Sequence, residues 1–219
     1  MAVIRWLHIS DLHLNKEGVE NVRIRENLPI YLKNLPLQCD YVFCTGDLRY
    51  APDGDYSDKT LDILENICEC VEVPLERLFV SSGNHDVDRD TEGRDNAIRN
   101  EWFTGNPQSK IYDPRIGSIK QQNLDVIMSG TNAFRHTLQK IIDAKETAFS
   151  NRIFRFGPHT LYKTRDFNII ELDSTISYTQ KQERDLIIGT RYLQQALDTC
   201  DKKNTILVMT HYSFDYLDR

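Results

Sequence analysis

The stretch LFVSSGNHD, residues 78–86, constrains the fold most strongly. Its apolar beginning, residues 78–81, predicts a buried strand. That strand ends at Gly83, where the backbone can turn closely, and three polar side chains follow: Asn84, His85 and Asp86. A buried strand that delivers polar groups to its carboxyl end is typical of a functional site.

The same construction occurs three more times. The other apolar runs and the polar residues that close them are residues 3–9 with Asp11 and His13, residues 41–45 with Gly46 and Asp47, and residues 205–209 with His211. In an open α/β sheet, sites form at the carboxyl ends of strands. We therefore expect all four groups to meet at one edge.

The segments between these strands complete an α/β pattern. Helical spacing of apolar residues and one further apolar run predict helices over 24–35, 61–71 and 192–197 and a strand over 167–172. Residues from about 89 to 150 interrupt this order with polar sequence and turn signals, and they contain one helical pattern near 134–142. We interpret residues 1–219 as one domain with a mainly helical insertion at about 89–150.

The bulk composition excludes several classes of protein. Apolar residues make up 40% and charged residues 27% of the chain, as in a globular protein with a substantial core. The sequence lacks a run of the roughly eighteen apolar residues that a membrane helix needs. Five dispersed cysteines do not form a zinc-ribbon pattern, and we predict reduced thiols and a cytoplasmic location.

The net charge of −6 argues against wholesale binding of nucleic acid, but it conceals an asymmetry. Residues 89–165 carry 13 Lys and Arg against 8 Asp and Glu, a net of +5, so the remainder of the chain has a net charge of −11. Part of that acidity is what a cation site requires. A solvated helical surface is the simplest interpretation of the basic residues in 89–165.

The four polar groups have the chemistry of metal ligands. Asp11 and His13 are two residues apart, and on an extended chain they would point to the same side and could hold one ion. Mixed oxygen and imidazole ligands suit Mn, Fe, Zn, Co or Ni better than Ca or Mg. Each block alone is a weak signal, but four in order, each after a predicted strand, predict a metal centre. By contrast, His8 lies within the first strand and is expected to be a core histidine.

These blocks resemble the calcineurin-like metallophosphoesterase superfamily, whose motifs run D-x-H, G-D, G-N-H-D/E, H and G-H-x-H. The resemblance implies a four-layer αββα sandwich with two mixed β-sheets and two divalent metal ions, with manganese the first expectation. One ion would be held by Asp11, His13 and Asp47, and the other by Asp47, Asn84 and His211. A hydroxide bridging the metals would attack phosphorus in line, with His85 beside the substrate phosphate.

Two departures from the family pattern stand out. The final G-H-x-H is absent, which suggests that the C-terminal part of the second sheet is missing. We therefore expect a further C-terminal domain or a partner protein. In addition, many relatives have G-D-x-x-D, whose second aspartate orients the G-N-H histidine, whereas this chain has Tyr50 at that position. Asp53, Asp55 or Asp86 could take over that role.

The sequence also indicates a function. His85 and Asp47 are the predicted catalytic residues, and Asn84, Arg49 and Arg89 are predicted substrate contacts, although an ion pair is an equally good interpretation of Arg49. The motif forms resemble phosphodiesterase-type members, so the leading hypothesis is a hydrolase of phosphoric diesters. One alternative is a DNA nuclease subunit that works with an ATPase partner, which the basic segment favours. Another is a non-catalytic scaffold with the same fold.

Overall fold

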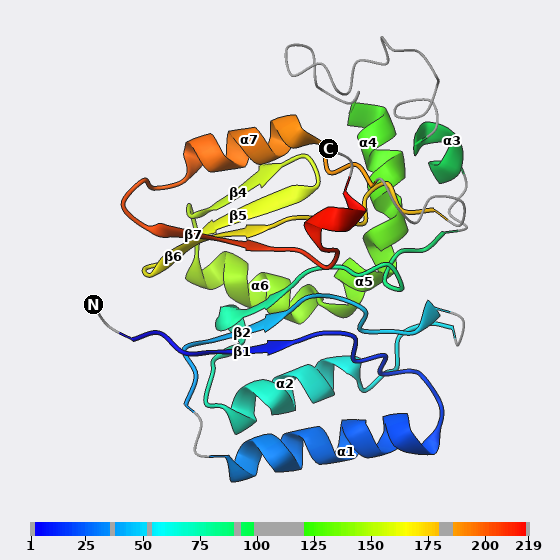
Figure 1. Ribbon diagram of the computed structural model, residues 1–219, viewed down its shortest axis with the longest axis vertical. Helices are drawn as coiled ribbons and strands as arrows, with labels where there is room; N and C mark the ends of the chain where they lie inside the picture. Colours follow the sequence, from blue (N-terminus) through cyan, green and yellow to red (C-terminus); the bar gives the residue numbers. More distant parts are fainter. Residues whose placement is uncertain are drawn as a thin grey trace.

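The computed structural model describes residues 3–35, 38–51, 54–89, 93–98, 121–179 and 186–217. Within them, two β-sheets lie face to face between helices (Figure 1). The strands are β1 (Trp6–Ile9), β2 (Tyr41–Cys44), β3 (Leu78–Val80), β4 (Ile153–Phe156), β5 (His159–Lys163), β6 (Phe167–Glu171) and β7 (Thr205–Met209). The α-helices are α1 (Val19–Asn34), α2 (Thr60–Cys70), α3 (Arg94–Ile98), α4 (Gln121–Met128), α5 (Asn132–Thr137), α6 (Gln139–Ala148) and α7 (Thr190–Thr199).

The first sheet has the order β1-β2-β3 and is parallel throughout, whereas the second, β4-β5-β6-β7, is mixed. Because side chains alternate along a strand, β2 and β3 each contribute side chains to two cores. Phe43 of β2 and Phe79 of β3 pack with Ile169 of β6 in the core between the sheets. The neighbouring Val42 and Leu78 face the opposite way, toward the helices.

Helices cover the outer face of each sheet. Leu32 of α1, Leu64 of α2 and Ile141 of α6 join the core on the outer face of the first sheet. On the second sheet, Ala196 of α7 packs against Ile170 of β6. The order helix, sheet, sheet, helix confirms the predicted four-layer αββα sandwich with two sheets. Both sheets were expected to be mixed, but among the described strands the first sheet is parallel and only the second is mixed.

The hairpin formed by β4 and β5 was not anticipated. Its sequence, IFRFGPHTLYK (153–163), does carry the signal, because short runs that contain β-branched and aromatic residues stand on both sides of the turn residues Gly157-Pro158. The hairpin adds the two antiparallel strands that make the second sheet mixed.

The segment predicted as a helical insertion contains α3 to α6 in its described part. Its last helices belong to the main core, since Phe134, Leu138 and Ile141 pack with residues of β2 and β3. The insertion boundaries at about 89 and 150 stay a prediction.

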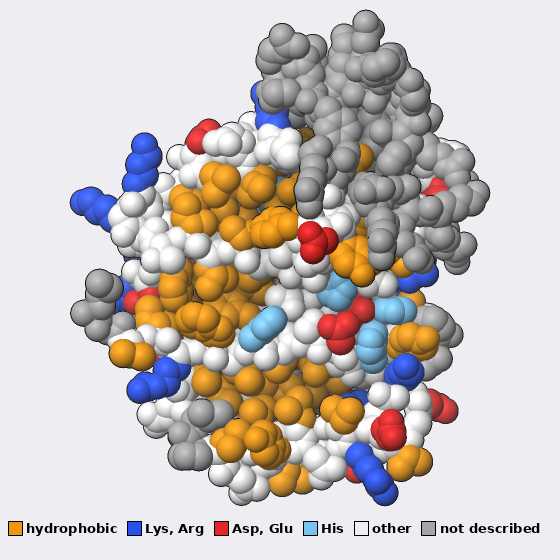
Figure 2. Space-filling view, in the orientation of Figure 1, with side chains coloured by type: hydrophobic (Ala, Val, Ile, Leu, Met, Phe, Trp, Pro, Cys, Tyr) orange, Lys and Arg blue, Asp and Glu red, His pale blue; other side chains and the backbone are white. Residues whose placement is uncertain are grey.

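The two sheets end in apolar edges on one side of the molecule. Among the described residues, β1 pairs in a sheet only with β2 and β7 only with β6. Trp6 on β1 is 50% exposed, and Ile206 and Val208 on β7 are 41% and 38% exposed. Figure 2 shows apolar side chains gathered over this face. His8, expected in the core, is exposed because it lies on this edge strand. The predicted continuation of the second sheet stays a prediction.

All five cysteines are free, in agreement with the reduced thiols expected from their spacing. Three of them, Cys44, Cys68 and Cys200, are buried in the core. Among the described helices, none combines the length and the apolar character that crossing a bilayer requires. The cytoplasmic location stays a prediction.

His159 makes the stability of the fold sensitive to acid. The ring is fully buried; its Nε2 lies 2.6 Å from the Ile188 carbonyl oxygen, and its Nδ1 accepts a bond from the Asp173 N–H at 3.2 Å. Burial lowers the pKa of His159 from 6.5 to about 4, although the nearby Asp173 opposes this. The folded protein therefore holds the neutral ring over a pH range in which the unfolded chain takes up a proton.

A depressed histidine pKa contributes stability that is complete above pH 6.5 and is lost as the pH falls toward 4. For the metal-free protein, this group alone should lower the free energy of unfolding by roughly 2 kcal/mol between pH 7 and pH 5. Urea titrations of wild type and His159→Gln at both pH values measure the effect. The variant should lose less stability than the wild type by this amount, and equal losses would contradict the assignment.

Candidate metal centre

The carboxyl ends of β1, β2, β3 and β7 converge, as the sequence predicts. Backbone bonds extend the first sheet beyond its strands: the Asp11 N–H donates to the Gly46 carbonyl and the His13 N–H to the Asp47 carbonyl, both at 3.0 Å. His211, which follows β7, reaches across from the second sheet, its Nδ1 lying 2.7 Å from the Thr45 carbonyl oxygen. Both sheets therefore contribute side chains to one site.

Three of the predicted ligands have unusual backbone conformations. Asp11, His13 and Asp47 lie in the left-handed region, with φ values of 57°, 44° and 55°. Such residues cost free energy and cluster at functional sites. They also correct one expectation: Asp11 and His13 are not on extended chain, so the two-residue alternation of a strand does not bring their side chains together.

Two glycines let the turns approach one another closely. A Cβ atom on Gly46 would lie 2.4 Å from the backbone nitrogen of Gly83, and one on Gly83 would lie 2.2 Å from Oδ1 of Asp47. Neither separation is possible for a real side chain. The glycines of the G-D and G-N-H-D blocks therefore allow the β2 and β3 turns to place Asp47 and His85 side by side.

Asp86 stabilises both turns through hydrogen bonds to their backbone N–H groups. Its fully buried carboxylate accepts bonds from the backbone N–H groups of Asp47 at 2.7 Å and Gly83 at 2.9 Å, and from the Tyr56 hydroxyl at 2.9 Å. Both carboxylate oxygens of Asp86 are engaged by these groups, and the His85 Nδ1 bonds to the Ala51 N–H instead, so Asp86 does not replace the missing aspartate of G-D-x-x-D. Asp55 faces Arg49 instead, and Asp53 lies outside the described residues.

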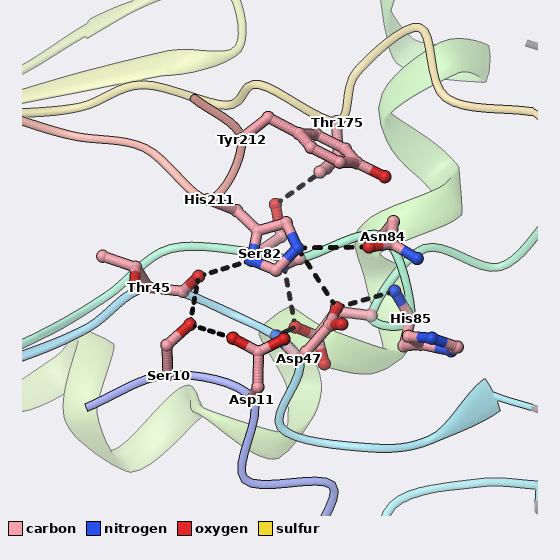
Figure 3. Close-up of polar contacts among 12 residues, drawn as sticks. Ser10, Asp11, Thr45, Asp47, Ser82, Asn84, His85, Thr175, His211 and Tyr212 are labelled. Carbon is pink, nitrogen blue, oxygen red and sulfur yellow. Dashed lines mark hydrogen bonds and ion pairs between the residues drawn. The ribbon is translucent and has the colours of Figure 1, made fainter. Parts of the chain in front are cut away.

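Asp47 is the centre of the site (Figure 3). Its side chain is buried, and its Oδ1 accepts a bond from the His85 backbone N–H at 2.8 Å. Burial raises the pKa of the Asp47 carboxyl to about 6, an effect that the nearby His211 ring and the His85 N–H oppose. A buried carboxylate without a Lys or Arg partner among the described residues is an anion that a metal cation would compensate.

Two groups of potential ligands share Asp47. One consists of Asp11, Asp47 and His211, and the other of His13, Asp47 and His85; in each group the ligand atoms lie within 4.8 Å of one another. The structure thus brings Asp47 between two sets, as the resemblance implied, but groups Asp11 with His211 rather than with His13. Asn84 joins the first set, since its Oδ1 lies 3.1 Å from His211 Nε2.

The partners of His13 and His211 set which ring nitrogen is free. His13 Nδ1 lies 3.1 Å from the Arg49 carbonyl oxygen, and His211 Nδ1 lies 2.7 Å from that of Thr45. Because a carbonyl only accepts, each neutral ring carries its proton on Nδ1 and leaves the Nε2 lone pair free. Metal-binding histidines typically have this arrangement.

The donor set around His211 fits a cation. Its Nε2 lone pair faces Asn84 Oδ1 at 3.1 Å and Asp47 Oδ1 at 3.7 Å. In this tautomer the three atoms are all electron-pair donors, and no proton lies between them. Their convergence is unfavourable alone and favourable around a positive ion, so the residues fit the divalent metal that the sequence predicts.

His85 has the opposite arrangement. Its Nδ1 accepts a hydrogen bond from the Ala51 backbone N–H at 3.2 Å. The neutral ring therefore carries its proton on Nε2, where it can donate a hydrogen bond but cannot bind a metal. Burial, followed by the nearby His13 and Arg89, lowers the pKa of His85 to about 4 and favours this neutral form. Its tautomer distinguishes His85 from the two ligand histidines.

The two predicted arginine contacts differ in the structure. Arg49 is buried, donates from Nε to the His85 carbonyl at 2.8 Å and pairs with Asp55 at 3.3 Å, which is the ion-pair interpretation. Arg89 stacks on the Tyr178 ring at 4.8 Å, and its buried Nε has no hydrogen-bond partner among the residues that the structure describes. Arg49 therefore has two of its donor atoms engaged by protein groups, whereas Arg89 keeps one donor atom without such a partner in the described part of the chain.

Comparisons with known proteins cover most of the chain. The family model for calcineurin-like phosphoesterases matches residues 4–217, a range that includes all four strand ends. A protein of Bacillus subtilis (strain 168), described as the uncharacterized metallophosphoesterase-like protein YydB, is 23% identical over 203 residues, or 91% of this chain. The chain spans 39% of the length of that relative.

Proposed function

Because the chain belongs to the calcineurin-like phosphoesterase family, we propose that it is a metal-dependent phosphodiesterase whose two divalent cations share Asp47. Phosphoric ester hydrolysis and divalent metal binding are the chemistry of the family. The observation that carries the dinuclear assignment is the position of Asp47 in both groups of potential ligands. The ring tautomers support it, because His13 and His211 each direct a free Nε2 toward Asp47.

The residues divide into ligands and substrate contacts. Asp11, Asn84 and His211 would hold one ion together with Asp47, and His13 would hold the other with Asp47. Bound there, two divalent cations would activate a water for in-line attack on phosphorus and neutralise charge on the phosphoryl oxygens. Mn is the metal that we test first, with Fe, Zn, Co and Ni as alternatives for the same ligand types.

His85 and Arg89 would act on the substrate directly. The Nε2–H of His85 would donate a hydrogen bond to an oxygen that gains negative charge as the ester bond breaks. A neutral imidazole does not give up that proton, so the role is electrostatic stabilisation rather than general-acid catalysis. Arg89 would pair its guanidinium group with a phosphoryl oxygen.

The test compares two substrates with the same leaving group. After reconstitution with Mn, the chain should hydrolyse bis(p-nitrophenyl) phosphate, a diester, faster than p-nitrophenyl phosphate, a monoester. A clear preference for the monoester would contradict the proposed class. Cleavage of a single-stranded oligonucleotide that weakens steeply with salt would indicate the nuclease alternative. Bound metal without hydrolysis of any substrate would indicate a scaffold.

A further inference from the structure

Asn15 holds the segment that carries Tyr50 and Ala51 through several hydrogen bonds. Its Oδ1 accepts a bond from the Tyr50 backbone N–H at 2.5 Å. Its Nδ2 lies within hydrogen-bond distance of three backbone carbonyls, those of Tyr50 and Gly54 at 3.1 Å and of Asp55 at 3.0 Å. One side chain thus ties the turn after β1 to two points of the segment after β2.

This segment contacts the His85 ring in two ways. The Ala51 N–H donates to Nδ1, and the Tyr50 ring lies against the imidazole, with centroids 4.8 Å apart and an interplanar angle of 36°. The Tyr50 ring also meets His13 edge-on at 5.3 Å. The backbone N–H and the tyrosine ring therefore occupy the place where an orienting carboxylate was expected.

We propose that Asn15 is a positioning residue: it holds Tyr50 and Ala51 so that the His85 ring keeps its proton on Nε2 and directs it toward the substrate. The effect on turnover rests on the proposed function, whereas the effect on the ring does not. A carboxylate at this place would accept a hydrogen bond from Nδ1–H, which places a proton on that nitrogen. A backbone N–H only donates, so the bond from Ala51 requires a lone pair on Nδ1 and leaves the ring proton on Nε2.

Asn15→Ala removes all the side-chain hydrogen bonds of Asn15. Asn15→Asp keeps the acceptor for the Tyr50 N–H but loses the donors to the three carbonyls. The matched control is Asn34→Ala, which removes one local bond to the Ile30 carbonyl at the end of α1. Nitrogen-15 NMR of metal-free, histidine-labelled protein reports which ring nitrogen is protonated, with His85→Ala to assign the signals. Hydrogen exchange of the Ala51 amide reports its bond to the ring.

In the wild type we expect an unprotonated Nδ1 on His85 and a protected Ala51 amide. In Asn15→Ala the exchange of this amide should accelerate by about tenfold or more. In the Mn form kcat should fall by about tenfold to a hundredfold, with KM and metal content unchanged. In Asn15→Asp, the Ala51 exchange rate and kcat should change in the same direction. This variant tests the proposal if Asn15→Ala does not fold.

Two results would overturn the proposal. One is a proton on Nδ1 of His85 in the wild type. The other is an Asn15→Ala or Asn15→Asp protein whose Ala51 exchange matches that of Asn34→Ala. If the wild type hydrolyses no phosphate ester, the proposed function fails. The NMR and exchange measurements still test whether Asn15 positions the His85 ring.

Discussion

Asp47→Asn is expected to eliminate binding of both divalent cations and all measurable ester hydrolysis. Asparagine has the same shape and can still accept the bond from the His85 N–H, so the fold should persist. The lost negative charge is the one that both groups of ligands share. Metal affinity should therefore fall by more than the roughly hundredfold that substitutions outside the ligand set cost.

Isothermal titration with Mn²⁺ and metal analysis after dialysis measure this effect. Asp198→Asn is the matched control, because Asp198 is an exposed aspartate on α7 whose carboxylate accepts a bond from Gln194. The variant should also lose the thermal stabilisation that Mn²⁺ gives to the wild type. Retention of one tightly bound ion in Asp47→Asn would show that Asp47 does not join the two sites.

His85→Ala should lower kcat by about a hundredfold to a thousandfold, the usual cost of losing one donor to a developing oxyanion. The number of bound metals should not change, since the proton on Nε2 keeps His85 out of the ligand set. His136→Ala, on α5, provides a histidine control. An unchanged kcat would remove His85 from the mechanism, and loss of a metal would make it a ligand.

Diesters with different leaving groups distinguish two possible roles of His85, hydrogen-bond donation and general-acid catalysis. If the ring only donates a hydrogen bond, the loss of rate should be similar for diesters that release a nitrophenol or an alkyl alcohol. A general acid matters far more for the poor leaving group. A loss that is large for the alkyl ester and small for the aryl ester would therefore contradict the neutral-donor role.

The strand ends could be predicted because they depend on local patterns. A short apolar run followed by glycine and polar residues marks a buried strand that ends at a site, and this pattern placed Asp47 and His85 correctly near each other. The αββα layers followed from the resemblance, and the structure agrees. The β4–β5 hairpin had a visible signal at Gly157-Pro158, but the preceding polar region obscured it.

Other features depend on tertiary contacts that no local pattern encodes. The grouping of Asp11 with His211 arises from left-handed backbone at Asp11 and from the approach of the second sheet, neither of which sequence spacing reveals. The tautomer of each of the three histidines of the site depends on a backbone group 34 or more residues away, such as the Ala51 N–H for His85. The exposure of His8 likewise depends on the place of β1 at the sheet edge.

The central claim is that Asp47 is shared by two cations held at the strand ends. Anomalous diffraction from Mn-soaked crystals at the manganese absorption edge tests it directly. The account predicts two peaks separated by about 3.5–4 Å, one near Asp11, Asn84 and His211, the other near His13, and both in contact with the Asp47 carboxylate. A single peak, or peaks that do not touch Asp47, would contradict it.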